Sequence, residues 1–447
     1  MITLVKAKNK TSLLFFPAFD WAISPNHPER EERLLYTRDQ IFEEGLMDLD
    51  EIIEYPPAVA NLEDIIKTHV CVTEPEDILT ESHLISAGSC KAIADSVIKG
   101  EVDKGFALVR PPGHHAMMIT HGARGFCNIN IEAVMVEYIR DNYDINKIAI
   151  IDTDAHHADG TQDIYINDPD VLHISVHQDG RTIFPGTGFP NDLGGPGGFA
   201  RTLNIPVPTN TTDKGLMYIM DKLIEPVLDD FQPDLIINAA GQDNHFSDPL
   251  TMMNITAQGY AELTSRLDPD IVVLEGGYSI EGALPYVNLG IILALAGLDY
   301  SHVKEPNLED YNITTSPRVM DMIIDNVKHL NEVYFARDQI DLNEYFGSKD
   351  KYTKKRNVFY DTSGFLEKQQ DEFLKCDNCS GIRITESSVY GRDHVIAVVI
   401  PRKACGGCIK KADYLINDFT AFFEKYDYVY LQDHARKNYI RFPEYKF

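Results

Sequence analysis

Short runs of Val, Ile and Leu recur along the middle of the chain, and polar or glycine-containing segments follow each of them. They span residues 147–151, 171–176, 234–238 and 270–274. Continuous apolar runs of this length are typical of strands that are buried on both faces, as in a parallel sheet. We therefore expect the middle of the chain to form a parallel sheet.

Helical periodicity alternates with these runs, notably at residues 132–141 and 213–228. This alternation predicts an α/β fold. A last helical pattern covers residues 318–335, and the lysine-rich segment 349–356 that follows predicts a linker. About 90 residues lie beyond it, with a strand-like run at 395–400. The chain thus divides into a large domain at 1–345 and a small one at 346–447.

Polar residues gather where three of the predicted strands end. Asp152 begins one such segment, Gly241 begins another, and residues 275–278 form the third. In open α/β sheets, ligands bind beyond the carboxyl ends of the strands. We expect the functional site at this edge of the sheet.

The segment Asp152-Thr-Asp-Ala-His-His-Ala-Asp-Gly160 places three carboxylates and two imidazoles in nine residues. These groups suit zinc or a similar divalent ion, and a catalytic zinc typically keeps three protein ligands and one open position. A further ligand must come from another part of the chain. Asp243 is one candidate, and the pair His114 and His115 is the other.

The net charge of −28 over 447 residues narrows the classes of partner. It disfavours broad contact with nucleic acid because phosphate binding needs a basic surface, although a local basic patch is compatible with it. An acidic surface can attract cationic substrates such as lysine side chains or polyamines, but such surfaces are also common without that role.

Membrane and secretory signals are weak. The lysines before residues 13–16 resemble the start of a signal peptide, but Pro17 and Asp20 interrupt the apolar run. The apolar stretch at 289–298 is far shorter than the roughly 18 residues of a membrane span. Seven cysteines without a disulfide-like spacing suit a reducing compartment. We expect a cytoplasmic protein that does not bind membranes.

Seven motifs, in order, resemble the arginase-deacetylase superfamily, and within it class II histone deacetylases and acetylpolyamine amidohydrolases. The resemblance covers roughly residues 10–335. The motifs are His27-Pro-Glu-Arg30, Arg110-Pro-Pro-Gly-His-His-Ala116, Gly125-Phe-Cys-Asn128, the 152–160 segment, Phe184-Pro-Gly-Thr-Gly188, Ala240-Gly-Gln-Asp243 and Leu274-Glu-Gly-Gly-Tyr278. The resemblance implies a three-layer arginase-deacetylase fold with a central, mostly parallel sheet, and a zinc-dependent deacetylase activity.

The resemblance also implies which residues hold metal ions. Asp154, His156 and Asp243 match the ligands of the catalytic zinc. A structural potassium ion is implied beside the same loop. Its ligands would be main-chain oxygens of Asp152, Asp154 and His156, together with Ser175.

The tandem histidines match the family's general acid–base pair. The resemblance places His114 and His115 near the zinc-bound water, oriented by Asp152 and Asp159. Hydrogen bonds of this kind fix the tautomer of an imidazole and raise its basicity. The family order makes His115 the general base, but the residues themselves do not distinguish the two histidines.

The remaining matches concern the substrate. Tyr278 matches the tyrosine that donates to the substrate carbonyl, and the Gly125 carbonyl would accept from the scissile amide. Phe126 and Phe184 resemble the walls of the acyl-lysine tunnel, and Leu250 falls at its rim. Without the resemblance, the phenylalanines would be read as core residues and Tyr278 as the end of a strand at a tight turn.

These residues predict hydrolysis of an acyl amide, with acetyl-lysine in a protein or an acetylated polyamine as substrate. Zinc would activate water, and Tyr278 would stabilise the oxyanion. The alternative is a catalytically weak module that binds an acyl ligand or a protein and is recruited through the C-terminal region. Tyr278 and the complete histidine pair favour the enzyme.

Four cysteines in the C-terminal region form a second candidate metal site. Cys376 and Cys379 are followed, after 25 residues, by Cys405 and Cys408. This spacing favours a structural zinc site in a ribbon-like domain over a pair of redox motifs. Such a domain can bind a protein partner, mediate self-association or place the substrate.

Overall fold

The largest of the three sheets that the described residues form in the computed structural model contains eight strands, all parallel to their neighbours. The described residues are 6–72, 74–311, 313–417 and 425–443. The strand order is β2-β1-β4-β10-β9-β6-β7-β8. The strands are β1 (Thr11–Phe16), β2 (Ile52–Tyr55), β4 (Lys104–Val109), β6 (Ile148–Asp152), β7 (Val171–Gln178), β8 (Thr202–Val207), β9 (Leu235–Ala240) and β10 (Ile271–Leu274). The four predicted strands are confirmed as β6, β7, β9 and β10.

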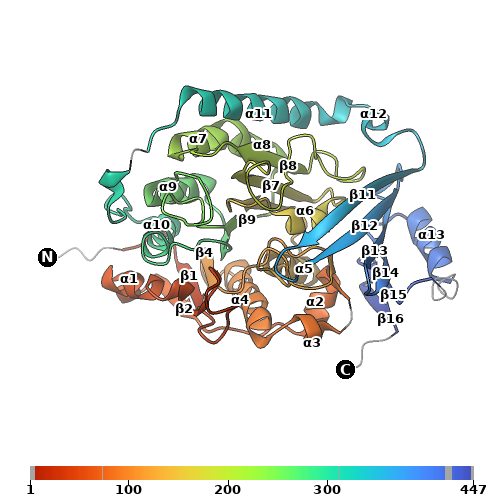
Figure 1. Ribbon diagram of the computed structural model, residues 1–447, viewed down its shortest axis with the longest axis horizontal. Coiled ribbons are helices and arrows are strands. Elements are labelled where there is room, and N and C mark those ends of the chain that lie inside the picture. The colour runs from red at the N-terminus through yellow and green to blue at the C-terminus, as the bar shows by residue number, and fades with distance from the viewer. Residues whose placement is uncertain (1–5, 73, 312, 418–424, 444–447) are drawn as a thin grey trace.

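Helices cover both faces of this sheet, as Figure 1 shows. They are α1 (Thr37–Glu43), α2 (Leu62–Thr68), α3 (Pro75–Ile78), α4 (Glu81–Ile98), α5 (Ile131–Asn142), α6 (Asp159–Tyr165), α7 (Asp213–Ile219), α8 (Glu225–Phe231), α9 (Ala257–Leu267), α10 (Leu284–Ala296), α11 (Pro317–Ala336) and α12 (Leu342–Phe346). The predicted helix at 213–228 is interrupted by a π-helical turn, Met220–Ile224, between α7 and α8.

Alternate side chains of each strand enter two separate cores. Ile148 and Ile150 of β6 pack in the core beneath α4 and α5, whereas Ala149 and Ile151 pack with α7 to α11 on the other face. Since both faces are buried, the strand reads as an unbroken apolar run. The fold is therefore the expected three-layer architecture.

Smaller elements complete this N-terminal region (residues 6–346). A two-stranded parallel sheet pairs β3 (Val70–Cys71) with β5 (Ile119–Thr120). Short 3-10 helices lie at Glu31–Leu34, Leu46–Asp48, Leu308–Asp310 and Arg337–Gln339. Among the described residues, no helix has both the length and the apolar character that crossing a membrane requires.

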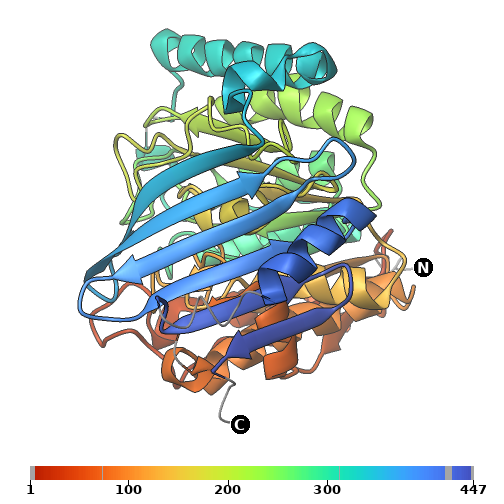
Figure 2. The same cartoon turned by 90° about the vertical axis from the view of Figure 1, so that its right-hand side faces the viewer.

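The C-terminal region (residues 351–443) forms a six-stranded sheet of its own, in the order β11 to β16. Its elements are β11 (Lys351–Tyr360), β12 (Phe365–Leu374), β13 (Ile382–Val389), β14 (His394–Ile400), α13 (Gly406–Asn417), β15 (Tyr428–Asp433) and β16 (Asn438–Phe442). In Figure 2 this sheet lies across the N-terminal region, with α13 on its outer face. The run predicted at 395–400 is confirmed as β14.

The linker predicted at 349–356 is wrong, because β11 begins at Lys351. Its side chains alternate between solvent and interior. Lys354 and Arg356 point inward, where they form ion pairs with Asp192 and Asp163 of the N-terminal region. Lys354 and Arg356, whose charges indicated a solvated linker, instead connect the two regions through ion pairs.

Charge is divided unequally between the two parts of the chain. Residues 346–447 carry 18 Lys and Arg against 14 Asp and Glu, a net charge of +4, whereas residues 1–345 carry 23 against 55, a net charge of −32. Among the described residues, every lysine or arginine that forms an ion pair between the regions lies on the C-terminal side. Complementary charge thus favours this docking and its orientation.

Candidate active site

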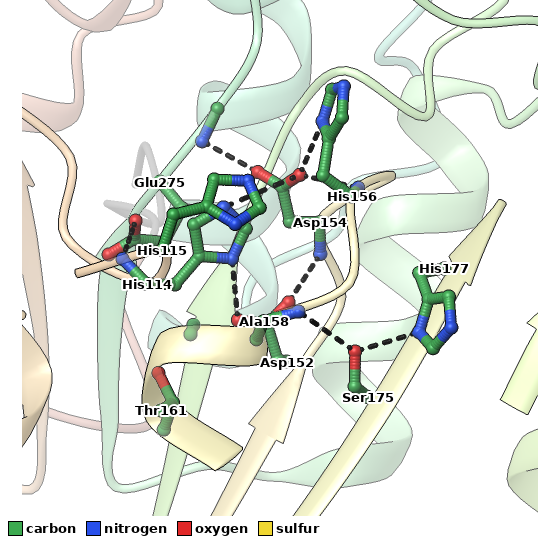
Figure 3. Close-up of polar contacts among 12 residues, drawn as sticks. His114, His115, Asp152, Asp154, His156, Ala158, Thr161, Ser175, His177 and Glu275 are labelled. Carbon is green, nitrogen blue, oxygen red and sulfur yellow. Dashed lines mark hydrogen bonds and ion pairs between the residues drawn. The ribbon is translucent and has the colours of Figure 1, made fainter. Parts of the chain in front are cut away.

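Four loops meet at the carboxyl edge of the eight-stranded sheet. They follow β4, β10, β9 and β6, which are neighbouring strands in that sheet. The loop after β4 carries the tandem histidines, and the loop after β10 carries Tyr278. The loops after β9 and β6 carry the predicted metal ligands. Figure 3 shows several of these side chains pointing toward one another. Strand order alone therefore brings together residues that lie far apart in the sequence.

Asp154, His156 and Asp243 form one candidate metal site, in which each offers a ligand atom and these atoms lie within 4.8 Å of one another. His156 Nδ1 is 3.1 Å from Asp154 Oδ1 and 3.0 Å from Asp243 Oδ2. Both carboxylates are fully buried. The Gly276 N–H donates to Asp154 Oδ2 at 2.8 Å, an approach that a side chain at 276 would block.

This donor set fits zinc. Zinc bonds of about 2.0–2.1 Å in a tetrahedron place ligand atoms roughly 3.3 Å apart, close to the observed separations. Burial disfavours a charged imidazole, yet Asp154 and Asp243 outweigh it and raise the pKa of His156 to about 10. The site thus favours positive charge between two buried carboxylates. A divalent cation supplies that charge and leaves the imidazole neutral, as a metal ligand must be.

The two histidines are each held by a carboxylate through Nδ1. His114 Nδ1 lies 3.1 Å from Asp152 Oδ2, and His115 Nδ1 lies 2.9 Å from Asp159 Oδ1. The two rings are 4.1 Å apart and nearly buried. Because Nδ1 is engaged in both rings, Nε2 is the nitrogen left for chemistry.

Their surroundings push the pKa values of these histidines apart. Burial opposes protonation of His114, but Asp154 and Asp152 outweigh it and raise its pKa well above the usual range. Burial and the neighbouring His114 lower the pKa of His115 to about 3. His115 is therefore the neutral imidazole of the pair, with the lone pair of its Nε2 free.

Arg124 orients Asp159, a role that the sequence did not reveal. Its Nη1 donates to Asp159 Oδ1 at 2.7 Å and its Nη2 to Oδ2 at 2.5 Å. Burial alone would raise the pKa of Asp159, but Arg124 and His115 hold it well below its usual range. The carboxylate that holds His115 therefore stays ionised and is fixed at both of its oxygens.

Glu275 is a second support that sequence reasoning missed. It is buried, and its Oε2 accepts from the Gly113 N–H at 2.8 Å and the His114 N–H at 3.0 Å. Its contact with the histidine loop is visible in Figure 3. It lies inside the quoted 274–278 motif, so the signal was present but had no assigned role.

Tyr278 lies on a loop fixed by a buried arginine. Arg33 Nε donates to the Gly277 carbonyl at 2.7 Å, Nη1 bonds Glu29 Oε2 at 2.9 Å, and the guanidinium lies 5.1 Å from the Tyr278 ring centre. Glu29 also binds Arg110 at 2.7 Å. Glu29 belongs to the first quoted motif, whereas nothing in the sequence marked Arg33.

The predicted substrate-binding residues surround this centre. The Phe126 ring packs edge-on against Tyr278, with ring centres 5.6 Å apart, and Phe184 packs against His115 at 5.1 Å. Leu250 is exposed, and its N–H bonds Asp248, which also accepts from the Tyr278 N–H. A surface cavity of about 390 Å³ next to Tyr278 is lined by Arg30, Tyr36 and residues 278–282. Its lining includes none of Phe126, Phe184 and Leu250.

Ser175, predicted to bind potassium, lies beside the ligand loop. Its Oγ is 3.5 Å from the Ala158 amide nitrogen, which donates to it, and 2.9 Å from His177 Nδ1 (Figure 3). Asp152 is the last residue of the neighbouring strand and pairs with Ser175 in the sheet. The potassium site itself stays a prediction.

The four C-terminal cysteines form the second cluster with ligand atoms within 4.8 Å of one another. Cys376 and Cys405 have sulfurs 3.7 Å apart, and those of Cys379 and Cys408 are 3.4 Å apart. Disulfide sulfurs lie about 2.05 Å apart, whereas zinc–sulfur bonds of about 2.3 Å give a tetrahedral edge of roughly 3.8 Å. The N–H of Cys408 and neighbouring thiols lower the pKa of Cys405 to about 7. This cluster fits a metal ion rather than a redox pair.

Comparison with known proteins agrees with this geometry. The family model of the histone deacetylase domain matches residues 63–288. A "Probable deacetylase" of Archaeoglobus fulgidus is 44% identical over 333 residues, which cover 68% of this chain and 91% of the relative. The chain belongs to the histone deacetylase family. The family resemblance drawn from the seven motifs is thereby confirmed.

A second sequence relative and a solved structure are also similar to this member of the histone deacetylase family. A "Histone deacetylase-like amidohydrolase" of Pseudomonas aeruginosa is 36% identical over 236 residues, covering 51% of this chain and 60% of that protein. The crystal structure of the HDA15 HD domain matches with a TM-score of 0.63 and 25% identity, over 74% of this chain and 96% of that one. The protein is therefore a deacetylase of a zinc-dependent family. Residues 351–443 lie outside the family match.

Proposed function

We propose that this deacetylase removes an acetyl group from a lysine side chain of a protein or from an acetylated polyamine, using zinc held by Asp154, His156 and Asp243. One observation carries the proposal. Three mutually close ligand atoms lie beside two imidazoles whose Nδ1 atoms are each fixed by a carboxylate. That combination of an open metal site and a general base is what hydrolysis of an unactivated amide needs.

When bound, zinc supplies Lewis acidity: it polarises the amide carbonyl and lowers the pKa of water. His115 accepts the water proton at Nε2 as the water oxygen bonds to the carbonyl carbon. The same proton then passes to the amine nitrogen as the carbon–nitrogen bond breaks. Asp159 keeps His115 oriented throughout, with Arg124 holding that carboxylate. His114, hydrogen-bonded to Asp152, adjusts the electrostatic potential at the metal site and at His115.

Tyr278 donates its hydroxyl hydrogen to the carbonyl oxygen, where negative charge develops. Burial raises the pKa of its phenol well above the ordinary value, so the group keeps the proton that it must donate. Phe126 and Phe184 line the path of the acyl-lysine chain and exclude water, and the Gly125 carbonyl accepts from the substrate amide. Leu250 contributes to the rim.

Two further metal ions belong to the proposal. Zinc bound by Cys376, Cys379, Cys405 and Cys408 stabilises the C-terminal region, because metal binding contributes folding free energy. A potassium ion at Ser175 and the main chain of the ligand loop rests on the family resemblance. We also propose that residues 1–345 form a deacetylase domain, residues 346–447 form a separate C-terminal domain, and the enzyme acts in the cytoplasm.

A substrate panel tests the proposal. Acetyl-lysine peptides and acetylated polyamines are incubated with zinc-loaded protein, and released acetate is measured together with bound zinc. We expect Tyr278→Phe to lower kcat about a hundredfold or more while zinc content stays unchanged, because the hydroxyl acts on the transition state. Tyr390→Phe, at a fully exposed tyrosine, is the matched control. Absence of turnover on every acyl amide by zinc-loaded wild type would contradict the proposal.

A further inference from the structure

The turn between β11 and β12 reaches from the C-terminal sheet to the loop that carries Gly125. Asp361 Oδ1 accepts from the Gly125 N–H at 2.7 Å. Ser363 Oγ accepts from the Ala123 N–H at 3.0 Å and donates to the Ala123 carbonyl at 3.1 Å. The Phe359 carbonyl accepts from Arg124 Nε at 3.1 Å. Three consecutive residues of the N-terminal loop are thus held by this one hairpin, whose strands cross toward the N-terminal region in Figure 1.

The loop that it holds has an uncommon backbone. Arg124 and Cys127 exchange hydrogen bonds of 2.9 and 2.8 Å around a two-residue turn. Both central residues have positive φ, 52° at Gly125 and 69° at Phe126. Such turns suit glycine, and a phenylalanine with positive φ is unfavourable unless surrounding contacts hold it. A Cβ at 125 would also lie 2.2 Å from the His115 ring.

The same loop serves the chemistry at two points. Arg124 clamps Asp159, which holds His115. Phe126 packs against Tyr278 on one side and against His27 on another, with ring centres 5.6 and 4.3 Å apart. A shift of this turn would therefore move both the orientation of His115 and one wall of the acyl path.

We infer that the β11–β12 turn is a component of the active site, in which Asp361 positions the Gly125–Phe126 turn and thereby sets acyl-chain selectivity. The inference rests on the proposed deacylation for its kinetic part. Asp361 acts through the loop and is a positioning residue. The C-terminal region thus takes part in catalysis at one end of its sheet, while the four-cysteine cluster lies elsewhere in the same region.

Hydrogen exchange and kinetics on two substitutions test this role. Asp361→Ala removes the acceptor, whereas Asp361→Asn keeps an oxygen that can accept from Gly125. Asp350→Ala, an exposed aspartate just before β11, is the matched control. Exchange is followed by mass spectrometry over residues 119–130. Values of kcat/KM are measured on formyl-, acetyl- and butyryl-lysine peptides, with zinc content determined on each sample.

For Asp361→Ala we expect faster exchange across 119–130, unchanged exchange in β6 and β9, and a fall in kcat/KM on acetyl-lysine of about tenfold to a hundredfold. The acetyl-to-butyryl ratio changes as well, because the Phe126 wall moves. Asp361→Asn and the control stay near wild type in all of these measurements.

The outcomes separate this inference from the proposed function. Unchanged exchange over 119–130 in Asp361→Ala overturns the inference whatever the activity of the enzyme. An equal fall for all three acyl chains, as a loss of active protein would cause, overturns it too. A wild type without turnover on the panel removes the proposed function, while faster exchange in Asp361→Ala still supports the positioning of the loop.

Discussion

Replacing Arg383 by methionine would break the buried ion cluster that joins the two regions. Arg383 Nη2 binds Asp163 Oδ1 at 2.6 Å, its Nη1 binds the Asp163 carbonyl at 2.7 Å, and its Nε binds Asp371 Oδ1 at 2.9 Å. Both carboxylates are fully buried. Burial would raise the pKa of Asp163, but Arg356 and Arg383 outweigh it and hold that pKa well below its usual range.

The magnitude follows from what remains after the substitution. Removing one partner of a buried ion pair costs about 3–5 kcal/mol, because the other charge is left without compensation. Arg356 still reaches both Asp163 and Asp371, so the cost lies at the lower end, about 3 kcal/mol. Since about 1.4 kcal/mol is a factor of ten, opening of the C-terminal sheet becomes roughly a hundredfold more frequent.

Native-state hydrogen exchange of peptides from β12 and β13 measures this opening directly. We expect Arg383→Met to speed their slowest exchange about a hundredfold, with β6 and β9 much less affected. Lys349→Met removes one exposed positive charge and is the matched control. Exchange within about threefold of wild type would contradict this prediction, since the cluster would then contribute no more than a surface ion pair does.

Three further substitutions test other parts of the account. Glu367 is buried, which raises its pKa to about 7, so folding loses stability as pH rises from about 4.5 to 7. Glu367→Gln should raise the melting temperature at pH 8 and have little effect at pH 5. Cys379→Ser should reduce bound zinc from two ions to one per chain, measured by mass spectrometry, and speed exchange in α13. Arg124→Lys keeps the charge but loses the two-point contact with Asp159, and kcat should fall about tenfold with zinc unchanged.

Each of these has its own control and contradicting result. Glu372→Gln, on the same strand, should leave the pH dependence of the melting temperature as in wild type. An equal rise in melting temperature at pH 5 and pH 8 for Glu367→Gln would contradict the cost of the buried charge. Ser380→Ala should keep both zinc ions. Two bound zinc ions per chain in Cys379→Ser would show that Cys379 is not a zinc ligand. Arg181→Lys, at an arginine whose side chain is 66% exposed, should keep full kcat. A wild-type kcat in Arg124→Lys would contradict the role of Arg124 in positioning Asp159.

The central strands could be predicted because a strand that is buried on both faces is a continuous run of apolar residues in the sequence. Ile148 to Ile151 are apolar at every position, since alternate residues enter different cores. β11 has no such run of apolar residues. Its inward-facing Lys354 and Arg356 are charged because their partners lie on another part of the chain, and that pairing cannot be read from a local window.

The same distinction separates the metal ligands from their supports. Asp154 and His156 lie together in one loop, and the density of carboxylates and imidazoles there is enough to indicate metal chemistry. Arg33 and Arg124 are isolated charges in the sequence, and their roles depend on long-range contacts with Gly277 and Asp159. The docking of the C-terminal region was equally hidden, although its net charge of +4 against −32 was a signal that counting each part separately would have revealed.

The most direct test of the central claim is to measure acetate release and zinc content on one sample while the metal is removed by chelation and then returned. We expect acetate release from an acetyl-lysine peptide to end when the zinc at Asp154, His156 and Asp243 is lost, and to return with one equivalent of zinc. Asp243→Asn should retain the four-cysteine zinc and stay inactive. Acetate release that persists after that zinc has gone, or its absence from protein that holds both ions, would contradict zinc-dependent deacetylation at this site.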